Sequence, residues 1–307
     1  MINSPSLKYS HNPKNTLKRG QHKFIAASLI PIVSLLIIFA LVPIAMGLWL
    51  SLYNYNPLNV ASPFVGFGNF KEMMTDTIFH KALFNTLIFV LISVPGNIII
   101  TLPVALAINA VSGKKLKDTF RTIFFLPTVT PIVAAALIWA SIYDPSYGLL
   151  NMILSSFGIN RIYWLSDPRT AMLSVIVVTL WQDMGYNIVI FLSGLESIPK
   201  MFYEAADLDG ANRWTVFTKI TLPLLSRTTL FIVVMTTISY FQVFTQVQIM
   251  TNGGPNYATQ TLALSIYQNA FVYSRMGYAS AMAVVLMVII LMVSLIQMRL
   301  MRNDWEY

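Results

Sequence analysis

Long apolar stretches separated by short polar connections dominate the pattern of this chain. The first stretch, residues 24–52, contains no charged side chain. A helix of this length is about 44 Å long at roughly 1.5 Å per residue, which exceeds the ~30 Å hydrocarbon core of a bilayer. The apolar part of a secretory signal is far shorter, and a polar tail precedes this stretch. The pattern therefore predicts a retained, tilted transmembrane helix.

Five further apolar stretches bring the predicted spans to six. They cover approximately residues 83–109, 120–143, 171–195, 222–249 and 279–298. Charged side chains within them are confined to Arg121 at the edge of the third span, Asp183 in the fourth and Arg227 near the start of the fifth. Prolines interrupt several spans, and neighbouring helices can satisfy the carbonyl groups that a proline frees. We therefore expect kinks in these helices and not breaks.

Composition excludes the common soluble classes. Hydrophobic residues make up 56% of the 307 residues and charged residues only 10%, whereas soluble domains have roughly 25% charged residues. The absence of cysteine excludes disulfides, thiol catalysis and cysteine-ligated metal. The three histidines do not have the spacing of metal ligands, so no metal site is predicted.

The distribution of Lys and Arg predicts the orientation in the membrane. The N-terminal tail, the connections 110–121 and 196–227 and the C-terminus carry 15 of the 20 basic residues. Because basic residues collect on the cytoplasmic side, both termini are predicted to be cytoplasmic. The expected organisation is a cytoplasmic tail at 1–23, a transmembrane domain at 24–301 and a cytoplasmic C-terminus at 302–307. The net charge of +8 follows from this topology, and no nucleic-acid partner is predicted.

The connection between the fourth and fifth spans, residues 198–221, has the most informative sequence. Its first part has the periodicity of a short helix with an apolar face, formed by Met201, Phe202, Ala205 and Leu208. Glu204 and Asp207 lie on another face, and small residues nearby would let a partner's backbone come close. The alternative is an amphipathic helix on the membrane surface. Such helices favour Lys and Arg on the polar face, whereas this one has acidic residues there.

This connection contains Glu204-Ala205-Ala206, then Gly210 four residues after Ala206, then Ile220, Leu222 and Pro223. Through these residues the chain resembles the permease subunits of binding-protein-dependent ABC importers. The spacing of every fixed position of their EAA signature is matched. In that family the loop forms a coupling helix, which lies in a cleft of a cytoplasmic ATPase. The resemblance implies an ATPase-coupling role for Glu204, Ala205, Ala206, Asp207, Gly210, Ile220 and Pro223.

The resemblance covers roughly residues 24–300. Residues 120–127 and 251–255 are similar to stretches of the carbohydrate-importing branch, in particular of its maltose-type first permease subunit. The maltose permease itself has extra N-terminal spans and a large periplasmic insertion, so maltose is not implied as the substrate. The implied fold is the all-α, six-helix bundle of type I importer permeases. The implied partners, in a bacterial cell membrane, are a second permease subunit, two ATP-binding subunits and an extracytoplasmic solute-binding protein.

The source of energy is predicted to lie outside this chain. A phosphate-binding GxxxxGK[ST] loop is absent from the sequence. No catalytic residue or cofactor is therefore predicted here, and ATP and Mg would be used by the partner ATPase. A gradient-driven transporter is the less favoured alternative, because such proteins show inverted repeats and several intramembrane ionisable groups. We find no convincing repeat and one acid within a span.

Polar side chains on the fourth and fifth spans are the candidates for a substrate pathway. An Asp at bilayer depth costs about 2.5–3.5 kcal/mol, so Asp183 is expected to face a polar cavity or a partner. Gln182, Tyr186 and Asn187 share its helical face. Amide, carboxylate and aromatic groups together suit sugar hydroxyls and the apolar faces of sugar rings. The alternative is an interhelical hydrogen-bond cluster that only holds the bundle together.

A second polar group lies on the fifth span. It consists of Tyr240, Gln242, Thr245 and Gln246. The resemblance also places Trp181, Tyr186 and Tyr240 where the maltose-type subunit has its sugar contacts. The predicted function is half of the translocation pathway of an ATP-driven importer of di- or oligosaccharides. Glycerol-3-phosphate or another polyol is the rival substrate, but a phosphate calls for Arg or Lys in the pathway and none lies at mid-depth.

Overall fold

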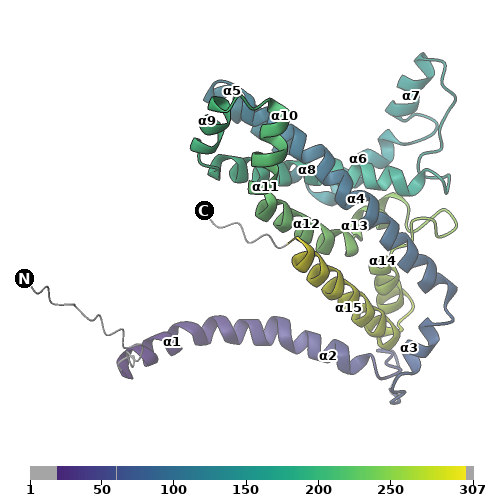
Figure 1. Cartoon of the computed structure of the whole chain (residues 1–307). Helices are drawn as coiled ribbons and strands as arrows, with labels where there is room; N and C mark the ends of the chain where they lie inside the picture. The colour runs from purple at the N-terminus through teal and green to yellow at the C-terminus, as the bar shows by residue number, and fades with distance from the viewer. Residues whose placement is uncertain (1–18, 60, 302–307) are drawn as a thin grey trace, which may run out of the picture. The chain divides into compact units, whose positions relative to one another are not determined.

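The computed structural model describes residues 19–59 and 61–301, and the regular elements in these ranges are helices (Figure 1). Residues 1–18 and 302–307, which hold most of the predicted cytoplasmic tail and the predicted C-terminal segment, lie outside the described residues. The chain divides into two compact units, Met1–Trp49 and Leu50–Tyr307. Each unit is described by itself.

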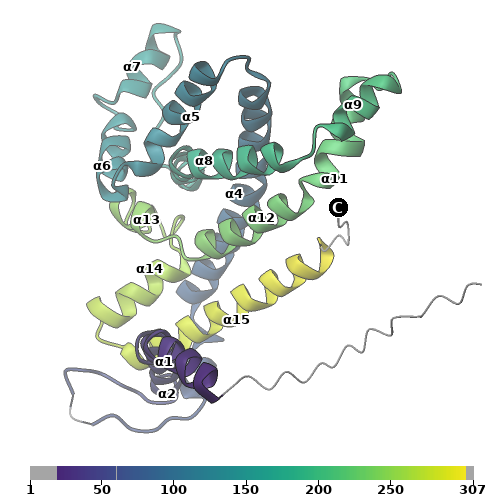
Figure 2. The ribbon, with the colours of Figure 1, turned by 90° about the vertical axis from the view of Figure 1, so that its left-hand side faces the viewer.

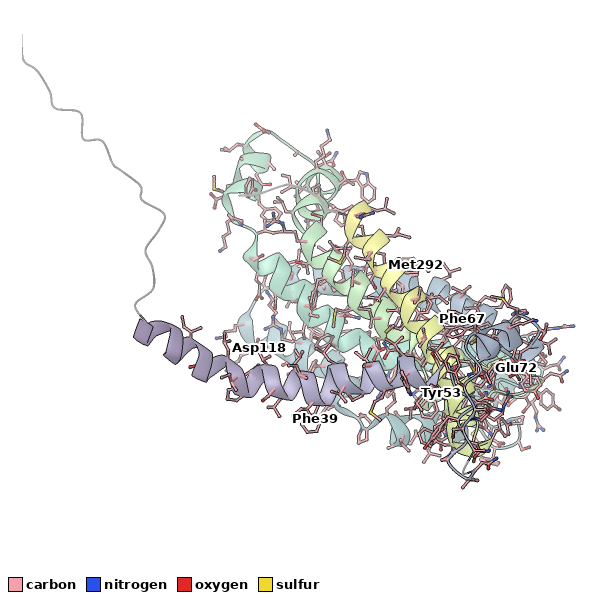
Figure 3. All side chains as sticks on the ribbon, turned by 90° about the horizontal axis from the view of Figure 1, so that it is seen from below. Phe39, Tyr53, Phe67, Glu72, Asp118 and Met292 are labelled. Carbon is pink, nitrogen blue, oxygen red and sulfur yellow. The ribbon has the colours of Figure 1, made fainter. Side chains whose placement is uncertain are left out.

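The first unit contains one continuous helical segment. It is built from α1 (Arg19–Leu36), the π-helical η1 (Ile37–Leu41) and α2 (Val42–Leu50). The part Ser28–Leu50 is long and apolar enough to cross a membrane, with a mean hydropathy of 2.8. Large apolar side chains are exposed all along it, and Figure 3 shows Phe39 projecting from η1. Such a surface suits contact with lipid chains or with another apolar helix.

Three helices of the second unit are each long and apolar enough to cross a membrane. They are α4 (Thr77–Ala110), α8 (Ala171–Ser197) and α15 (Met276–Leu300), which contain the second, fourth and sixth predicted spans. α4 begins earlier than predicted because the carboxylate of Asp76 caps it, accepting hydrogen bonds from the backbone N–H groups of Ile78 and Phe79 at 2.8 and 3.2 Å. Pro95 and Pro103 lie inside α4 without interrupting it, as expected.

The third predicted span is broken, so the expectation of kinks alone is wrong here. α5 (Lys114–Val129) and α6 (Ile132–Ile142) meet at an angle of 92°. Thr130 has an extended backbone with ψ of 132°. Pro131 causes this geometry, because a proline disfavours the helical conformation of the residue before it and has no N–H to donate.

The fifth predicted span is also divided. The helical segment Arg213–Leu224 and α12 (Ser226–Phe241) are bent by 63° relative to each other, and α12 ends before the separate helix α13 (Thr245–Met250). The break leaves Gln242, Val243 and Phe244 outside both helices. If each bent pair counts as one crossing, the described residues contain up to six candidate spans.

The spans of the second unit pack around α4 and α8. One buried apolar cluster includes Phe89 and Val247, and a second includes Phe191 and Leu192. α12 and α15 lie side by side (Figure 2). α5 approaches α8 closely at Gly185, where an added Cβ would overlap the carbonyl oxygen of Phe124.

Short helices connect the spans. They are α3 (Gly68–Met73), α7 (Leu149–Ser156), α9 (Met201–Leu208), α10 (Arg213–Val216), η2 (Phe217–Thr221), α11 (Leu222–Leu224), α14 (Leu262–Tyr267) and η3 (Gln268–Val272). α3 is tied to the residue before α15 by an ion pair between Glu72 and Arg275, whose charged atoms lie 2.5 Å apart. α9 and α10 lie together at one end of the second unit (Figure 1).

Candidate functional site

The predicted coupling loop folds as two short helices joined by a tight turn. α9 ends at Leu208, and Gly210 follows it with a φ of +69°, which glycine readily adopts because it lacks a Cβ. The side chain of Asn212 then caps α10, accepting a hydrogen bond from the backbone N–H of Thr215 at 2.8 Å. Local sequence thus determines both the end of one helix and the start of the next.

The face of α9 that packs on the chain only partly matches the apolar face expected from its periodicity. Ala206 is buried, and Phe202 and Tyr203 pack against the cluster around Phe191. Met201 and Leu208, expected on the apolar face, are 66% and 90% exposed. Phe202 packs as expected, and the helix is turned so that Tyr203 packs beside it, because an aromatic ring provides a large surface to bury.

The outward face of α9 therefore combines apolar and acidic groups. Its exposed residues are Met201, Glu204, Ala205, Asp207 and Leu208. Exposed large apolar side chains beside carboxylates are typical of a surface that another protein covers. Ile220 and Pro223, also predicted for coupling, lie in the bent segment that joins the two short helices to α12.

A separate cavity lies deeper in the helical bundle, where the broken helices meet. It has a volume of about 310 Å³ and is lined from α6, α8, α12, α13 and the break before α13. Five residues that were predicted for the pathway line it: Asp183, Tyr240, Gln242, Thr245 and Gln246. The remaining lining residues are Ile132, Thr179, Ser239, Val243 and Phe244. The break of the fifth span brings Gln242 and Thr245 to the same cavity.

A chain of hydrogen bonds leads to this cavity from the interior of the bundle. The amide nitrogen of Asn187 donates to the side-chain oxygen of Asn97 at 2.8 Å, and the amide nitrogen of Asn97 donates to the hydroxyl oxygen of Tyr240 at 3.1 Å. Tyr240 and Asp183 both line the cavity, so this chain of hydrogen bonds ends at the wall that also carries the carboxylate. Three helices, α4, α8 and α12, are connected in this way.

The other residues predicted for the pathway have different surroundings. The amide nitrogen of Gln182 donates to the backbone oxygen of Thr130 at 3.1 Å and so ties α8 to the break between α5 and α6. Trp181 packs edge to face on Trp139, with ring centroids 5.4 Å apart. The side chain of Tyr186 is about half exposed. The residues of the predicted polar face of the fourth span thus have three kinds of surroundings. Asp183 lines the cavity, Gln182 and Asn187 make interhelical hydrogen bonds, and Tyr186 is about half exposed.

Sequence reasoning missed Asn97, which lies in the charge-free second span and is fully buried. The sequence could have identified Asn97, because an amide in the middle of an apolar span must find hydrogen-bond partners inside the bundle. Thr179 and Ser239, which line the cavity, were also missed because a single hydroxyl in a span readily bonds its own helix backbone. Within the described residues no group of three His, Asp or Glu side chains is arranged to hold a metal ion.

Comparison with known proteins identifies the family. The family described as binding-protein-dependent transport system inner membrane component matches residues 99–303. This range includes α9, α10 and all the residues that line the cavity. The chain belongs to this family. The resemblance proposed from the EAA signature, and the all-α permease fold, are thereby confirmed.

Relatives of this permease include transporters of sugars and of a phosphorylated polyol. It is 36% identical to the probable ABC transporter permease protein YurN of Bacillus subtilis, over 94% of this chain and 99% of YurN. It is 29% identical to the trehalose/maltose permease protein MalF of Thermococcus litoralis, over 95% and 98% of the two chains. It is 32% identical to the sn-glycerol-3-phosphate permease protein UgpA of Agrobacterium fabrum, over 90% and 94%.

A solved structure has the same fold as this permease. It is a bacterial alginate ABC transporter in complex with an alginate pentasaccharide-bound periplasmic protein. The matched chain is 26% identical, with a TM-score of 0.82 over 92% of this permease and 95% of that chain. The likeness thus covers nearly the whole of both proteins.

Replacing Asn97 with leucine is expected to destabilise the permease. The change leaves the hydroxyl oxygen of Tyr240 without its donor and the amide of Asn187 without its acceptor, at about 1–3 kcal/mol for each group. Thermal unfolding of the purified complex should show a lowered Tm. Ser93→Ala, one turn away, removes a buried hydroxyl that has no hydrogen-bond partner and should leave the Tm unchanged. Equal Tm values for the two variants would contradict the structural role of Asn97.

Proposed function

We propose that this permease forms half of the translocation pathway of an ATP-driven importer of di- or oligosaccharides. The observation that carries the proposal is the cavity of about 310 Å³, because it combines the carboxylate of Asp183, the amides of Gln242 and Gln246 and the aromatic ring of Phe244. Amides and carboxylates bind sugar hydroxyls, and an aromatic ring packs on the apolar face of a sugar. The trehalose/maltose and alginate relatives support a carbohydrate substrate.

The outward face of α9 supports coupling to a cytoplasmic ATPase. Glu204 and Leu208 are exposed there, whereas Ala206 anchors the helix to the bundle. In the proposed assembly two ATP-binding subunits use ATP and Mg, a second permease completes the pathway, and an extracytoplasmic binding protein delivers the sugar. Closure of the ATPases moves the α9–α10 segment, and the bend before α12 passes this movement to the span that lines the cavity. Both termini of the permease are cytoplasmic in this arrangement, which lies in a bacterial cell membrane.

Glycerol-3-phosphate is the second candidate substrate, because UgpA is as similar to this chain as the sugar permeases are. Phosphate recognition relies on Arg or Lys. No basic residue is among the described residues that line the cavity. The lack of a basic residue among them favours a neutral sugar over a phosphorylated polyol.

Uptake into proteoliposomes tests the proposal. The complex is purified from native membranes through a tag on this chain and reconstituted with its binding protein outside and ATP inside. We expect accumulation of a radiolabelled neutral di- or oligosaccharide that requires ATP and does not respond to ionophores. A non-hydrolysable ATP analogue is the control and should give no uptake. Uptake by this chain alone, driven by an ion gradient, would overturn the proposal in favour of a secondary transporter.

A further inference from the structure

The cavity contains one charged side chain. Ten residues line it, and among them Asp183 is acidic while lysine, arginine and histidine are absent. The ion pairs found among the described residues join Glu196 to Lys117 and Arg121, and Glu72 to Arg275. Asp183 belongs to none of them. Among the described residues, therefore, no cation lines the cavity beside this carboxylate.

The two hydrogen bonds that lead to the cavity wall have the same direction. Asn187 donates to Asn97, and Asn97 donates to the hydroxyl oxygen of Tyr240. Since that oxygen accepts from Asn97, the hydroxyl proton of Tyr240 is available to another acceptor, and Tyr240 lines the same cavity as Asp183. Bonds aligned in this way polarise one another, and they hold the Tyr240 hydroxyl at the wall of the cavity that Asp183 also lines.

The chain of donors is rigidly held. Asn97 is 0%, Tyr240 1% and Asn187 3% exposed, so these side chains are enclosed by α4, α8 and α12. Asp183 is less buried and faces the cavity. The carboxylate of Asp183 therefore lines the same cavity as the enclosed side chain of Tyr240.

The geometry points to Asp183 as the residue that selects the cavity's ligands by charge: neutral, hydroxyl-rich sugars are accepted, and sugars or polyols bearing phosphate, carboxylate or sulfonate groups are rejected. Sugar hydroxyls donate hydrogen bonds to the carboxylate, whereas an anionic ligand meets a like charge in surroundings of low dielectric constant. Asn97 acts as a positioning residue through Tyr240. This inference rests on the proposed function, since it names the class of substrate for the same cavity.

The absence of cysteine from this chain allows a direct test. Gln242→Cys places one thiol at the cavity wall. The thiol in the assembled complex is treated with two methanethiosulfonate reagents, one with a cationic trimethylammonium group and one with an anionic sulfonate group. The increase in the mass of this chain with time gives the reaction rate for each reagent. Each rate is divided by the rate for free cysteine. Adding Asp183→Asn is expected to lower the cation-to-anion rate ratio by about tenfold, because attraction of one reagent and repulsion of the other are both lost.

Three further variants keep the result interpretable. Asp183→Glu retains the charge and should retain the ratio, and Asp118→Asn removes an exposed acid of α5 outside the cavity and should not alter it. Ser239→Cys, also at the cavity, replaces the first thiol if the Gln242 variant is not recovered. An unaltered ratio after Asp183→Asn at the tested thiol would overturn the inference. Labelling requires no transport, so a failure of ATP-driven uptake would contradict the proposed function and leave this measurement valid.

Discussion

Replacing Glu204 with lysine is expected to release the ATPase from the complex and to abolish ATP-driven uptake. Glu204 lies on the exposed face of α9, beside Ala205 and away from the buried Ala206. Reversing a charge at an interface costs about 2–5 kcal/mol, which corresponds to a loss of affinity of at least about 30-fold. Lysine is as good a helix former as glutamate, so α9 itself should persist. Quantitative mass spectrometry after a mild-detergent pull-down of this chain measures the recovered ATPase.

A matched charge reversal tests whether the effect belongs to the coupling face. Asp118 is exposed on α5 and is not part of the EAA signature (Figure 3). Asp118→Lys should retain the ATPase and uptake. In both variants the second permease should still copurify, which shows that the membrane part has assembled. Recovery of the ATPase with the Glu204 variant at the wild-type level would remove the support for coupling through α9.

Replacing Gly185 with leucine is expected to prevent assembly of the permease. A Cβ at this position would overlap the Phe124 carbonyl oxygen and lie 2.8 Å from the Cα of Phe125 and from the Thr128 hydroxyl. Two of these three atoms belong to the backbone of α5, so no side-chain rotation relieves the overlap. The cost should exceed the about 1–3 kcal/mol of ordinary overpacking, because α5 and α8 must separate. The yield of folded complex after size-exclusion chromatography measures the loss.

Gly47 provides the control for this substitution. It lies in the apolar helix α2, and an added Cβ there has no atom within 4 Å. Gly47→Leu should give a normal yield, because leucine is a better helix former than glycine and suits an apolar surface. A normal yield from Gly185→Leu as well would show that the α5–α8 contact tolerates a side chain and that the packing described for it is wrong.

Much of the fold follows from local features of the sequence. Apolar length predicts α4, α8 and α15 because a span must be long enough to cross the hydrocarbon core. The spacing from Glu204 to Pro223 predicts the short helices between two spans, and Gly210 predicts the end of the first of them. Each of these features depends on residues close together in the chain, so the sequence contains the whole signal.

The sequence by itself determined that this protein is an all-α membrane permease, which residues build its spans and coupling segment, and which polar side chains are candidates for a pathway. Only the tertiary structure decided that the chain breaks a span at Thr130 and Pro131, that α9 packs Tyr203 and not Leu208 against the bundle, and that Asp183 faces a cavity while Asn187 bonds Asn97. Periodicity places residues on a face of a helix but does not specify what that face meets. The partner is set by contacts between α4, α8 and α12, which are distant in the sequence, and by the competition among their side chains for burial.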